Sequence, residues 1–172
     1  MYIPENLPTQ KIKKGTIVLF KGDDCKYTYK ILRGCLRSYI INEKGKEVTL
    51  IFAPEDWLLT DFNSFIYNEP SVFFIDAIED SEVLLLGRNL IAELPQYKNE
   101  DLIERIFVLT KNIIAINKRL SMLLGSTPIE RYKDFIKSYP NLIQRIPQKL
   151  IASYIGVSSE HLSTLKNNNL FF

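Results

Sequence analysis

The sequence is poor in features that mark membrane, secreted and metal-binding proteins. Among its 172 residues there is no apolar run of about 18 or more, so we expect no transmembrane helix. The N-terminal segment MYIPENLPTQKIKKG lacks the apolar centre that a signal peptide needs. These two absences predict a cytoplasmic protein.

Cysteine and histidine are also scarce. Cys25 and Cys35 are the only cysteines, too few for a disulfide framework or an iron–sulfur cluster. His161 is the only histidine, and one histidine cannot form a metal site alone. The sequence has no phosphate-binding glycine loop and no recognisable pair of nucleophile and base. We therefore expect neither a metal site nor an enzyme.

The charge of the chain is small in total but unevenly distributed. The net charge is +2. Residues 1–104 contain 12 Lys and Arg against 17 Asp and Glu, a net −5, whereas residues 105–172 contain 10 against 3, a net +7. A polyanion is therefore attracted by the C-terminal part and repelled by the N-terminal part.

Residues 9–88 have the pattern of an all-β module. Short apolar segments rich in Val, Ile, Tyr and Phe alternate with glycine-containing turns, which predicts a sandwich or barrel-like roll. The expected strands cover residues 16–20, 27–32, 36–41, 48–52, 72–75 and 83–86, and a short helix is expected at 61–67.

Residues 101–124 change to a helical period. Leucines and isoleucines recur at alternating intervals of four and three, the seam of a coiled coil about three heptads long. A second apolar stripe, formed by Ile103, Phe107, Thr110 and Ile114, flanks it. One stripe can pack on the β-roll while the other contacts a second copy; packing of the seam itself on the roll is the alternative. The expected homodimer interface consists of Leu102, Ile106, Leu109, Ile113, Ile116, Leu120 and Leu123.

A capping box predicts where the next helix begins. Gly125 ends the long helix, Thr127 is the N-cap, Pro128 suits the first helical position, and Glu130 completes the box. The sequence thus divides into residues 1–98, 99–125 and 126–172.

Residues 148–167, QKLIASYIGVSSEHLSTLKN, predict two helices joined by a tight turn. Ala152 is small where the helices must cross, and Gly156 suits a left-handed backbone at the end of the first helix. Ser158 can cap the second helix, which Leu162 and Leu165 hold against the first. This spacing is typical of a DNA-binding helix-turn-helix, and an ordinary helical hairpin with a solvated face is the alternative.

The outer face of the second helix is polar. We expect Arg145 and Lys118 to contact DNA phosphates, in addition to two lysines nearer this helix. The expected DNA-binding residues are Ser158, Ser159, Glu160, His161, Ser163 and Thr164, together with Lys166 and Lys149.

A β-roll, a long helix and a helix-turn-helix, in this order, resemble the Crp/Fnr family of bacterial transcription regulators over nearly the whole chain. The most specific parts are residues 145–166, YKILRGCLR at 29–37 and AIEDSEV at 77–83. The resemblance implies an α+β fold. It comprises an N-terminal antiparallel β-roll (a double-stranded β-helix of cyclic-nucleotide-binding type), a long dimerisation helix and a C-terminal all-α helix-turn-helix domain. It also implies a homodimer, double-stranded DNA as partner, and RNA polymerase as a second candidate partner.

The chain departs from the family where its nucleotide-binding members hold the cyclic phosphate and ribose. Those members use a Gly-Glu pair and, ten residues after the Glu, an Arg. The matching effector-pocket candidates are Thr60, Asp61 and Ser71. Ser71 cannot supply a guanidinium to a phosphate, so we expect that cAMP is not bound in the usual way. The roll senses another small molecule or none, and Asp61 is alternatively a helix-start residue.

A second departure lies in the predicted recognition helix. Family members that read guanines commonly carry arginines at the positions of Ser159 and Thr164. Glu160 does match the family's usual glutamate, which can accept a hydrogen bond from a cytosine amino group. The sequence stops at Phe172, so the β-hairpin wing of many relatives is expected to be missing or truncated.

Two functions therefore compete. The first is a homodimeric, DNA-binding transcription regulator. The second is a ligand-sensing or interaction module with the same fold that has lost sequence-specific DNA binding.

Overall fold

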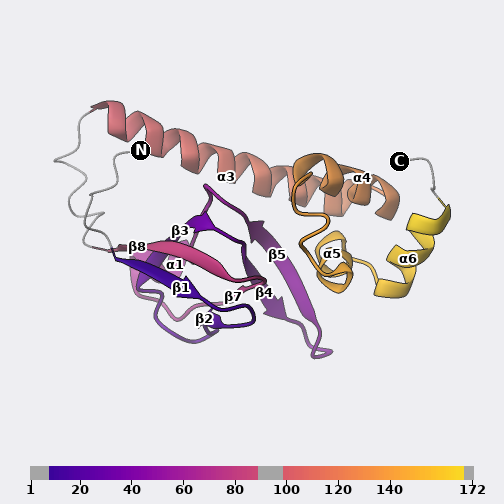
Figure 1. The fold of residues 1–172 in the computed structure, drawn as a ribbon, viewed down its shortest axis with the longest axis horizontal. Coiled ribbons are helices and arrows are strands. Elements are labelled where there is room, and N and C mark those ends of the chain that lie inside the picture. Colours follow the sequence, from indigo (N-terminus) through magenta and orange to yellow (C-terminus); the bar gives the residue numbers. More distant parts are fainter. Residues whose placement is uncertain (1–7, 89–98, 169–172) are drawn as a thin grey trace.

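Two antiparallel sheets build the N-terminal half of the molecule. The computed structural model describes residues 8–88 and 99–168 (Figure 1). Its first sheet has the strand order β1-β8-β3-β6 and its second the order β2-β7-β4-β5, which together form the β-roll. The strands are β1 (Thr9–Ile12), β2 (Ile17–Leu19), β3 (Tyr27–Arg33), β4 (Leu36–Ile41), β5 (Glu47–Ala53), β6 (Leu58–Leu59), β7 (Phe74–Ala77) and β8 (Ser81–Gly87).

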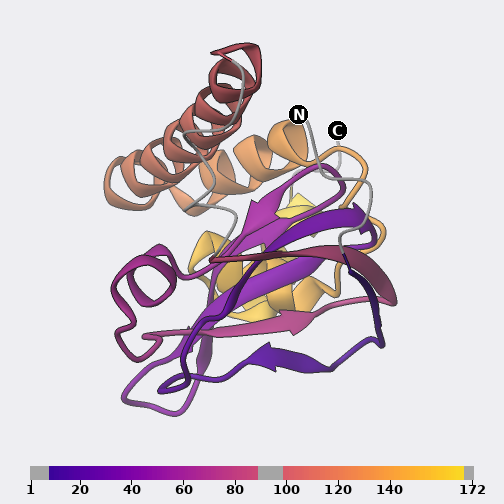
Figure 2. The ribbon, with the colours of Figure 1, turned by 90° about the vertical axis from the view of Figure 1, so that its left-hand side faces the viewer.

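An apolar core lies between the two sheets. Side chains of a strand alternate between its two faces, so β8 buries Ser81 and Val83 while Glu82 between them is more exposed. The core includes Ile31 of β3 and Ile75 of β7, both fully buried. Figure 2 shows the strands of the roll lying beside the long helix α3.

The predicted strands are confirmed, with small shifts in their ends. The segment expected at 72–75 begins two residues later, at Phe74. Strands β1 and β6 were not predicted from the sequence. In β1 only Ile12 is buried, and β6 has 2 residues, so neither carries an alternating apolar pattern.

The predicted short helix is also present. Helix α1 (Phe62–Tyr67) begins after Asp61, whose side chain accepts a hydrogen bond from the backbone amide of Ser64. It ends at Asn68, which adopts a left-handed backbone conformation, as is common for asparagine after a helix. Asp61 is therefore the helix-start residue that was considered as the alternative to a ligand contact.

Four helices form the rest of the described chain. Helix α3 (Asn99–Gly125) is followed by α4 (Pro128–Ser138), α5 (Gln148–Ile155) and α6 (Ser159–Asn168). The capping box predicted for α4 is confirmed, because Thr127 accepts from the Glu130 amide and the Glu130 carboxylate accepts from the Thr127 amide. The fold class predicted from the sequence is confirmed at the level of an antiparallel roll followed by helices.

A second apolar core joins the roll to the C-terminal helices. Phe52 of β5 is fully buried, and its ring centroid lies 6.1 Å from that of Phe135 in α4 and 5.3 Å from that of Tyr154 in α5. Cys35 and Ile78 of the roll belong to the same core. Burial raises the pKa of the Cys35 thiol far above its usual value, so it is a packing residue rather than a nucleophile.

No helix in residues 8–88 and 99–168 is long and apolar enough to cross a membrane.

Candidate nucleic-acid surface and effector region

Helices α5 and α6 enclose a tight turn. Gly156 follows α5 with a φ of 76°, a left-handed conformation that glycine adopts without a Cβ clash. Its backbone amide donates to the carbonyls of Ala152 and Ser153. Ser158 accepts a hydrogen bond from the backbone amide of His161 and so caps α6. Leu162 is completely buried against α5. The predicted sequence of helix, left-handed glycine, cap and helix is therefore confirmed.

The outer face of α6 is open to solvent. The candidate DNA-binding side chains are exposed, except Lys166, which is half-buried: Ser158, Ser159, Glu160, His161, Ser163, Thr164, Lys166 and, on α5, Lys149. Hydrogen bonds from its own backbone amide and from Ser158 lower the pKa of Glu160, so this carboxylate is ionised near neutral pH. Thr164 donates its hydroxyl to the Glu160 carbonyl one turn earlier. The face thus offers one carboxylate and several small hydroxyl groups.

Hydrogen bonds fasten α5 to strand β5 of the roll. The Ser153 hydroxyl accepts from the Thr49 amide at 2.9 Å and donates to the Glu47 carbonyl at 2.8 Å. Arg119 of α3 donates to the Thr49 and Tyr154 carbonyls and stacks on the Tyr154 ring at 3.7 Å. One arginine thus joins α3, the roll and α5. Desolvation by burial lowers its pKa, since no carboxylate of residues 8–88 or 99–168 forms an ion pair with it.

Arg145 forms a further bridge between the roll and the C-terminal helices. Its guanidinium donates to both carboxylate oxygens of Glu55, the shorter bond being 2.7 Å, and also to Glu79. The hydrogen bond from Arg145 is the main reason why the pKa of Glu55 is lowered. Lys118 is likewise paired with Asp134. Both cations were expected to contact DNA phosphates, but in this structure they are engaged by carboxylates of the chain.

Both apolar stripes of α3 face outward. The described seam residues Ile106, Leu109, Ile113, Ile116, Leu120 and Leu123 keep 37% to 63% of their surface exposed. The flanking residues Ile103, Phe107, Thr110 and Ile114 are exposed too. The side chain of Leu102 lies outside the described residues.

A third face of α3, different from both apolar stripes, packs against the rest of the chain. It carries Asn112, Ala115, Arg119 and Met122, which are half-buried, and the Asn112 amide donates to the Leu58 carbonyl. The expectation that one apolar stripe packs on the roll is therefore wrong. A face of mostly polar or small side chains makes this contact. Both apolar stripes are therefore left uncovered within the described chain.

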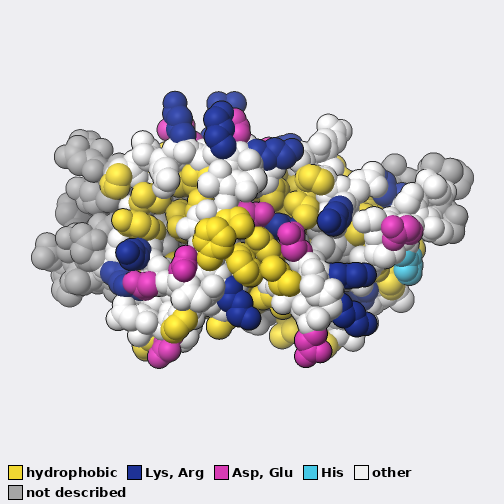
Figure 3. Space-filling model, turned by 90° about the horizontal axis from the view of Figure 1, so that it is seen from below, with side chains coloured by type: hydrophobic (Ala, Val, Ile, Leu, Met, Phe, Trp, Pro, Cys, Tyr) yellow, Lys and Arg dark blue, Asp and Glu magenta, His cyan; other side chains and the backbone are white. Residues whose placement is uncertain are grey.

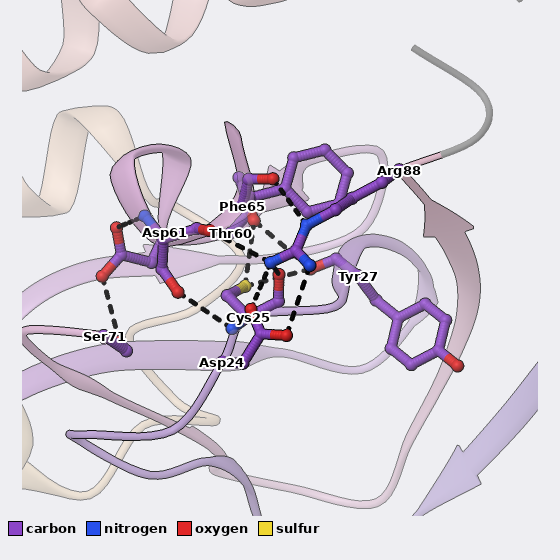
Figure 4. A network of polar contacts seen from close by, with 9 residues as sticks. Asp24, Cys25, Tyr27, Thr60, Asp61, Phe65, Ser71 and Arg88 are labelled. Carbon is purple, nitrogen blue, oxygen red and sulfur yellow. Dashed lines mark hydrogen bonds and ion pairs between the residues drawn. The ribbon is translucent and has the colours of Figure 1, made fainter. Parts of the chain in front are cut away.

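The three effector-pocket candidates lie together, but their polar groups already have partners in the chain (Figure 4). Asp61 is 2% exposed and accepts hydrogen bonds from the Ser64 amide, the Val72 amide and the Ser71 hydroxyl. The Ser71 hydroxyl lies 3.0 Å from the Asp61 carboxylate. The Thr60 hydroxyl donates to the Tyr27 carbonyl at 3.2 Å. These groups hold α1 and the segment before β7 against β3.

Arg88 places a cation in this region that was not predicted from the sequence. Arg88 follows β8 and donates to the Phe65 and Ser64 carbonyls in the last turn of α1 (Figure 4). It also donates to the Cys25 carbonyl and pairs with Asp24. All three of its nitrogen atoms thus donate to protein acceptors. The partners lie 23 to 64 residues away in sequence, so no local pattern marks Arg88 as part of this region.

Comparisons with known proteins agree with this architecture. The family model of the cyclic nucleotide-binding domain matches residues 9–97. The chain therefore belongs to the cyclic nucleotide-binding domain family. It is 28% identical to the regulatory protein HlyX of Actinobacillus pleuropneumoniae over 90% of this chain and 68% of HlyX.

Solved structures extend the likeness beyond the roll. FixK2 of Bradyrhizobium japonicum superposes with a TM-score of 0.80 at 15% identity, covering 95% of this chain and 84% of FixK2. A Crp/Fnr family transcriptional regulator of Thermus thermophilus gives a TM-score of 0.72 at 15% identity, covering 95% and 86% of the two chains. With the roll, the long helix and the C-terminal helices, these similarities show that the chain has the fold of Crp/Fnr-type transcription regulators.

Proposed function

We propose that the protein acts as a homodimer that binds double-stranded DNA through α6 and thereby regulates transcription. The observation that carries this proposal is the combination of an uncovered apolar seam on α3 with an open polar face on α6. The seam supplies the surface for a second copy, and α6 supplies the surface for DNA. RNA polymerase is a further candidate partner of a complex assembled in this way.

The uncovered seam supports the dimer. Ile106, Ile113 and Leu120 follow one another at heptad spacing and are each more than half exposed. Large apolar side chains in a continuous stripe of this kind are typical of a protein interface. A two-fold axis along α3 would give the dimer two equivalent α6 helices, which could enter successive major grooves about 34 Å apart.

The open face of α6 supports DNA as the ligand. Residues at the start of such a helix commonly contact base edges, and Glu160 is an ionised acceptor that can pair with a cytosine amino group. Lys149 and Lys166 flank this position and can contact phosphates. Residues 105–172 carry the positive charge of the chain, which favours a polyanion here.

Two substitutions on α6 test these roles. Glu160→Ala should change the preferred DNA sequence, because loss of a base contact alters discrimination by about 1–3 kcal/mol at one position. Lys166→Ala should weaken binding to all sequences alike and reduce the slope of log K against log salt by about 1. Competition binding to a randomised duplex library measures both effects. Equal losses on every sequence from both variants would refute the assignment.

We further propose that the roll does not bind cAMP in the usual way. The polar groups of Asp61 and Ser71 are engaged with each other, and Arg88 is engaged with carbonyls and Asp24. A cyclic phosphate would have to displace these partners. We therefore expect the roll to bind an effector of another class or no effector. Calorimetry with cAMP and with cGMP should show no heat of binding at micromolar concentration; saturable micromolar binding of either would overturn this point.

One observation favours a second candidate function, an interaction module without specific DNA binding. Ser159 and Thr164 have short neutral side chains where guanine-reading relatives commonly carry arginine, and the Glu160 carboxylate is hydrogen-bonded to Ser158. A titration with genomic DNA fragments at fixed salt separates the two functions. Binding no tighter than about 10⁻⁶ M to every fragment favours the interaction module.

A further inference from the structure

The hairpin that joins β4 to β5 lies next to the start of α6. A hollow of about 430 Å³ separates the two, and Lys46 and Glu47 of the hairpin line it together with Lys149, Ser158, Ser159 and Glu160. Figure 1 shows the hairpin projecting from the roll toward the C-terminal helices. A residue of the roll thus stands beside the end of α6 that is proposed to contact bases.

The turn of this hairpin is held by its own hydrogen bonds. The Asn42 side chain accepts from the amides of Lys44 and Lys46, both at 3.0 Å. The Asn42 amide donates to the Lys46 carbonyl, and Gly45 adopts a left-handed conformation with a φ of 70°. A turn fixed in this way presents its two lysines at a defined place, which reduces the entropy lost when they bind a partner.

The hairpin also keeps its position relative to α6. The Ser153 hydroxyl of α5 binds the Glu47 carbonyl and the Thr49 amide at the start of β5. Because α5 and α6 pack on one another through Leu162, a ligand bound by α6 meets the hairpin in a fixed orientation. The roll and the start of α6 therefore form one continuous surface.

The charges on this surface favour an anion. Lys44, Lys46 and Lys149 form no ion pair with any residue in the described ranges 8–88 and 99–168. The Glu47 carboxylate is paired with the buried Arg37 at 2.9 Å and is thereby neutralised. Glu43 and Glu160 are the opposing charges. In Figure 3, dark-blue side chains gather on this part of the face, near the cyan histidine.

We propose that the tip of the β4–β5 hairpin contacts the DNA phosphates that flank the base pairs read by α6, chiefly through Lys46 and Lys44. DNA binding then extends from the C-terminal helices onto the N-terminal roll, which has no positive excess of its own, since residues 8–88 contain 11 Lys and Arg against 12 Asp and Glu. This inference rests on the proposed function. It adds a phosphate-contacting element that lies outside the helix-turn-helix.

The test compares two double variants of the full chain by fluorescence anisotropy with a bound duplex over a range of salt concentrations. Lys44→Ala with Lys46→Ala removes the hairpin charges. Lys21→Ala with Lys26→Ala is the matched control, because it removes two exposed lysines near Asp24 and α1, at the other end of the roll from α6. The net charge of the two variants is the same.

The hairpin variant should lose affinity about five- to tenfold at moderate salt, and its slope of log K against log salt should fall by about 0.9 for each phosphate contact removed. The loss should be equal for specific and non-specific duplexes, while the control keeps the slope of the unmodified protein. An unchanged slope, or a slope change equal to that of the control, overturns the inference. Tighter binding by the hairpin variant overturns it too, because the hairpin would then obstruct DNA.

A failure of this inference differs from a failure of the proposed function. If the unmodified protein binds no duplex, the proposed function and the inference both fall. If it binds and the hairpin variant binds equally well, only the hairpin contact is wrong. Loss of transcriptional output with unchanged DNA binding would point to a protein partner at the hairpin, and would likewise contradict a phosphate contact.

Discussion

The interior around Asp61 and the outer face of α6 both carry polar side chains, but they differ in whether those groups have partners within the chain. Asp61 accepts three hydrogen bonds and is almost completely buried. On α6, Ser159, His161 and Ser163 are exposed. Buried polar groups must be satisfied for the chain to fold, whereas exposed ones can be satisfied by water or by a ligand. The groups around Asp61 therefore stabilise the fold, whereas the face of α6 is open to the ligand proposed for it.

Helix α3 repeats the same contrast within one element. Its half-buried face, which includes Asn112 and Arg119, donates hydrogen bonds to carbonyls of the roll and of α5. Its apolar face, which includes Ile113, has no cover in the described chain. Polar groups hold α3 on its own chain, and the apolar stripe is the surface proposed to contact a second copy. This is the reverse of the usual expectation that the apolar side of a helix faces its own core.

The largest effect is expected from a charge placed in the seam. Ile113→Glu puts a carboxylate from each copy at the two-fold axis, and burying such charges should weaken the dimer by about 4 kcal/mol, roughly a thousandfold. Sedimentation velocity at micromolar concentration should show a monomer. Ser121→Glu, an exposed position of α3 outside the seam, is the control and should remain dimeric. A dimer that persists in Ile113→Glu would assign the uncovered stripe another role.

A smaller effect is expected from Asp61. Asp61→Ala removes the cap of α1 and leaves the Ser64 and Val72 amides without their acceptor, which should lower the free energy of unfolding by about 3 kcal/mol. Urea denaturation measures this difference, and Glu69→Ala, an exposed carboxylate after α1, should be neutral. A loss below about 0.5 kcal/mol would mean that Asp61 is not needed for the fold and is free to serve a ligand.

The smallest effect concerns the contact between the roll and the C-terminal helices. Arg145 lowers the pKa of Glu55, so this pair stabilises the folded state at any pH above the ordinary pKa of a glutamate. The stabilisation is lost as the pH falls through the lowered pKa. Both side chains are partly exposed, so Glu55→Gln should cost about 1 kcal/mol at pH 7 and less at about pH 3, because protonation of Glu55 weakens the pair. Urea denaturation at the two pH values measures it. A difference that does not depend on pH would assign Glu55 a role other than the ion pair.

Features decided by a few neighbouring residues could be predicted from the sequence. The box of Thr127, Pro128 and Glu130 fixes the start of α4, and Gly156 fixes the end of α5, because each acts through backbone groups within a few residues. The strands of the roll followed from their apolar alternation. For the same reason β1 was missed, since three of its four residues are exposed.

Features that depend on distant partners could not be predicted. Arg145 meets Glu55 across 90 residues, Ser153 meets Thr49 across 104, and Arg88 meets Cys25 across 63. Pairs so far apart leave no periodic pattern in the sequence. The candidate pocket residues were correctly expected to lie together, but their hydrogen bonds to each other depend on how α1 packs against β3. The predicted orientation of α3 on the roll was wrong for the same reason. Arg119 and Asn112 fix this orientation by donating to carbonyls of β5 and β6.

The most direct test of the account is the affinity of the purified full chain for duplex fragments of its own genome, at one fixed salt concentration near 150 mM. A dimer that reads DNA through α6 should bind at least one fragment with a Kd of about 10⁻⁸ M or tighter, and a thousandfold more tightly than the bulk of the fragments. Ile113→Glu should abolish that preference. Uniform binding at about 10⁻⁶ M or weaker, the same for all fragments and for both proteins, would contradict the claim that the uncovered seam and the open face of α6 serve DNA recognition.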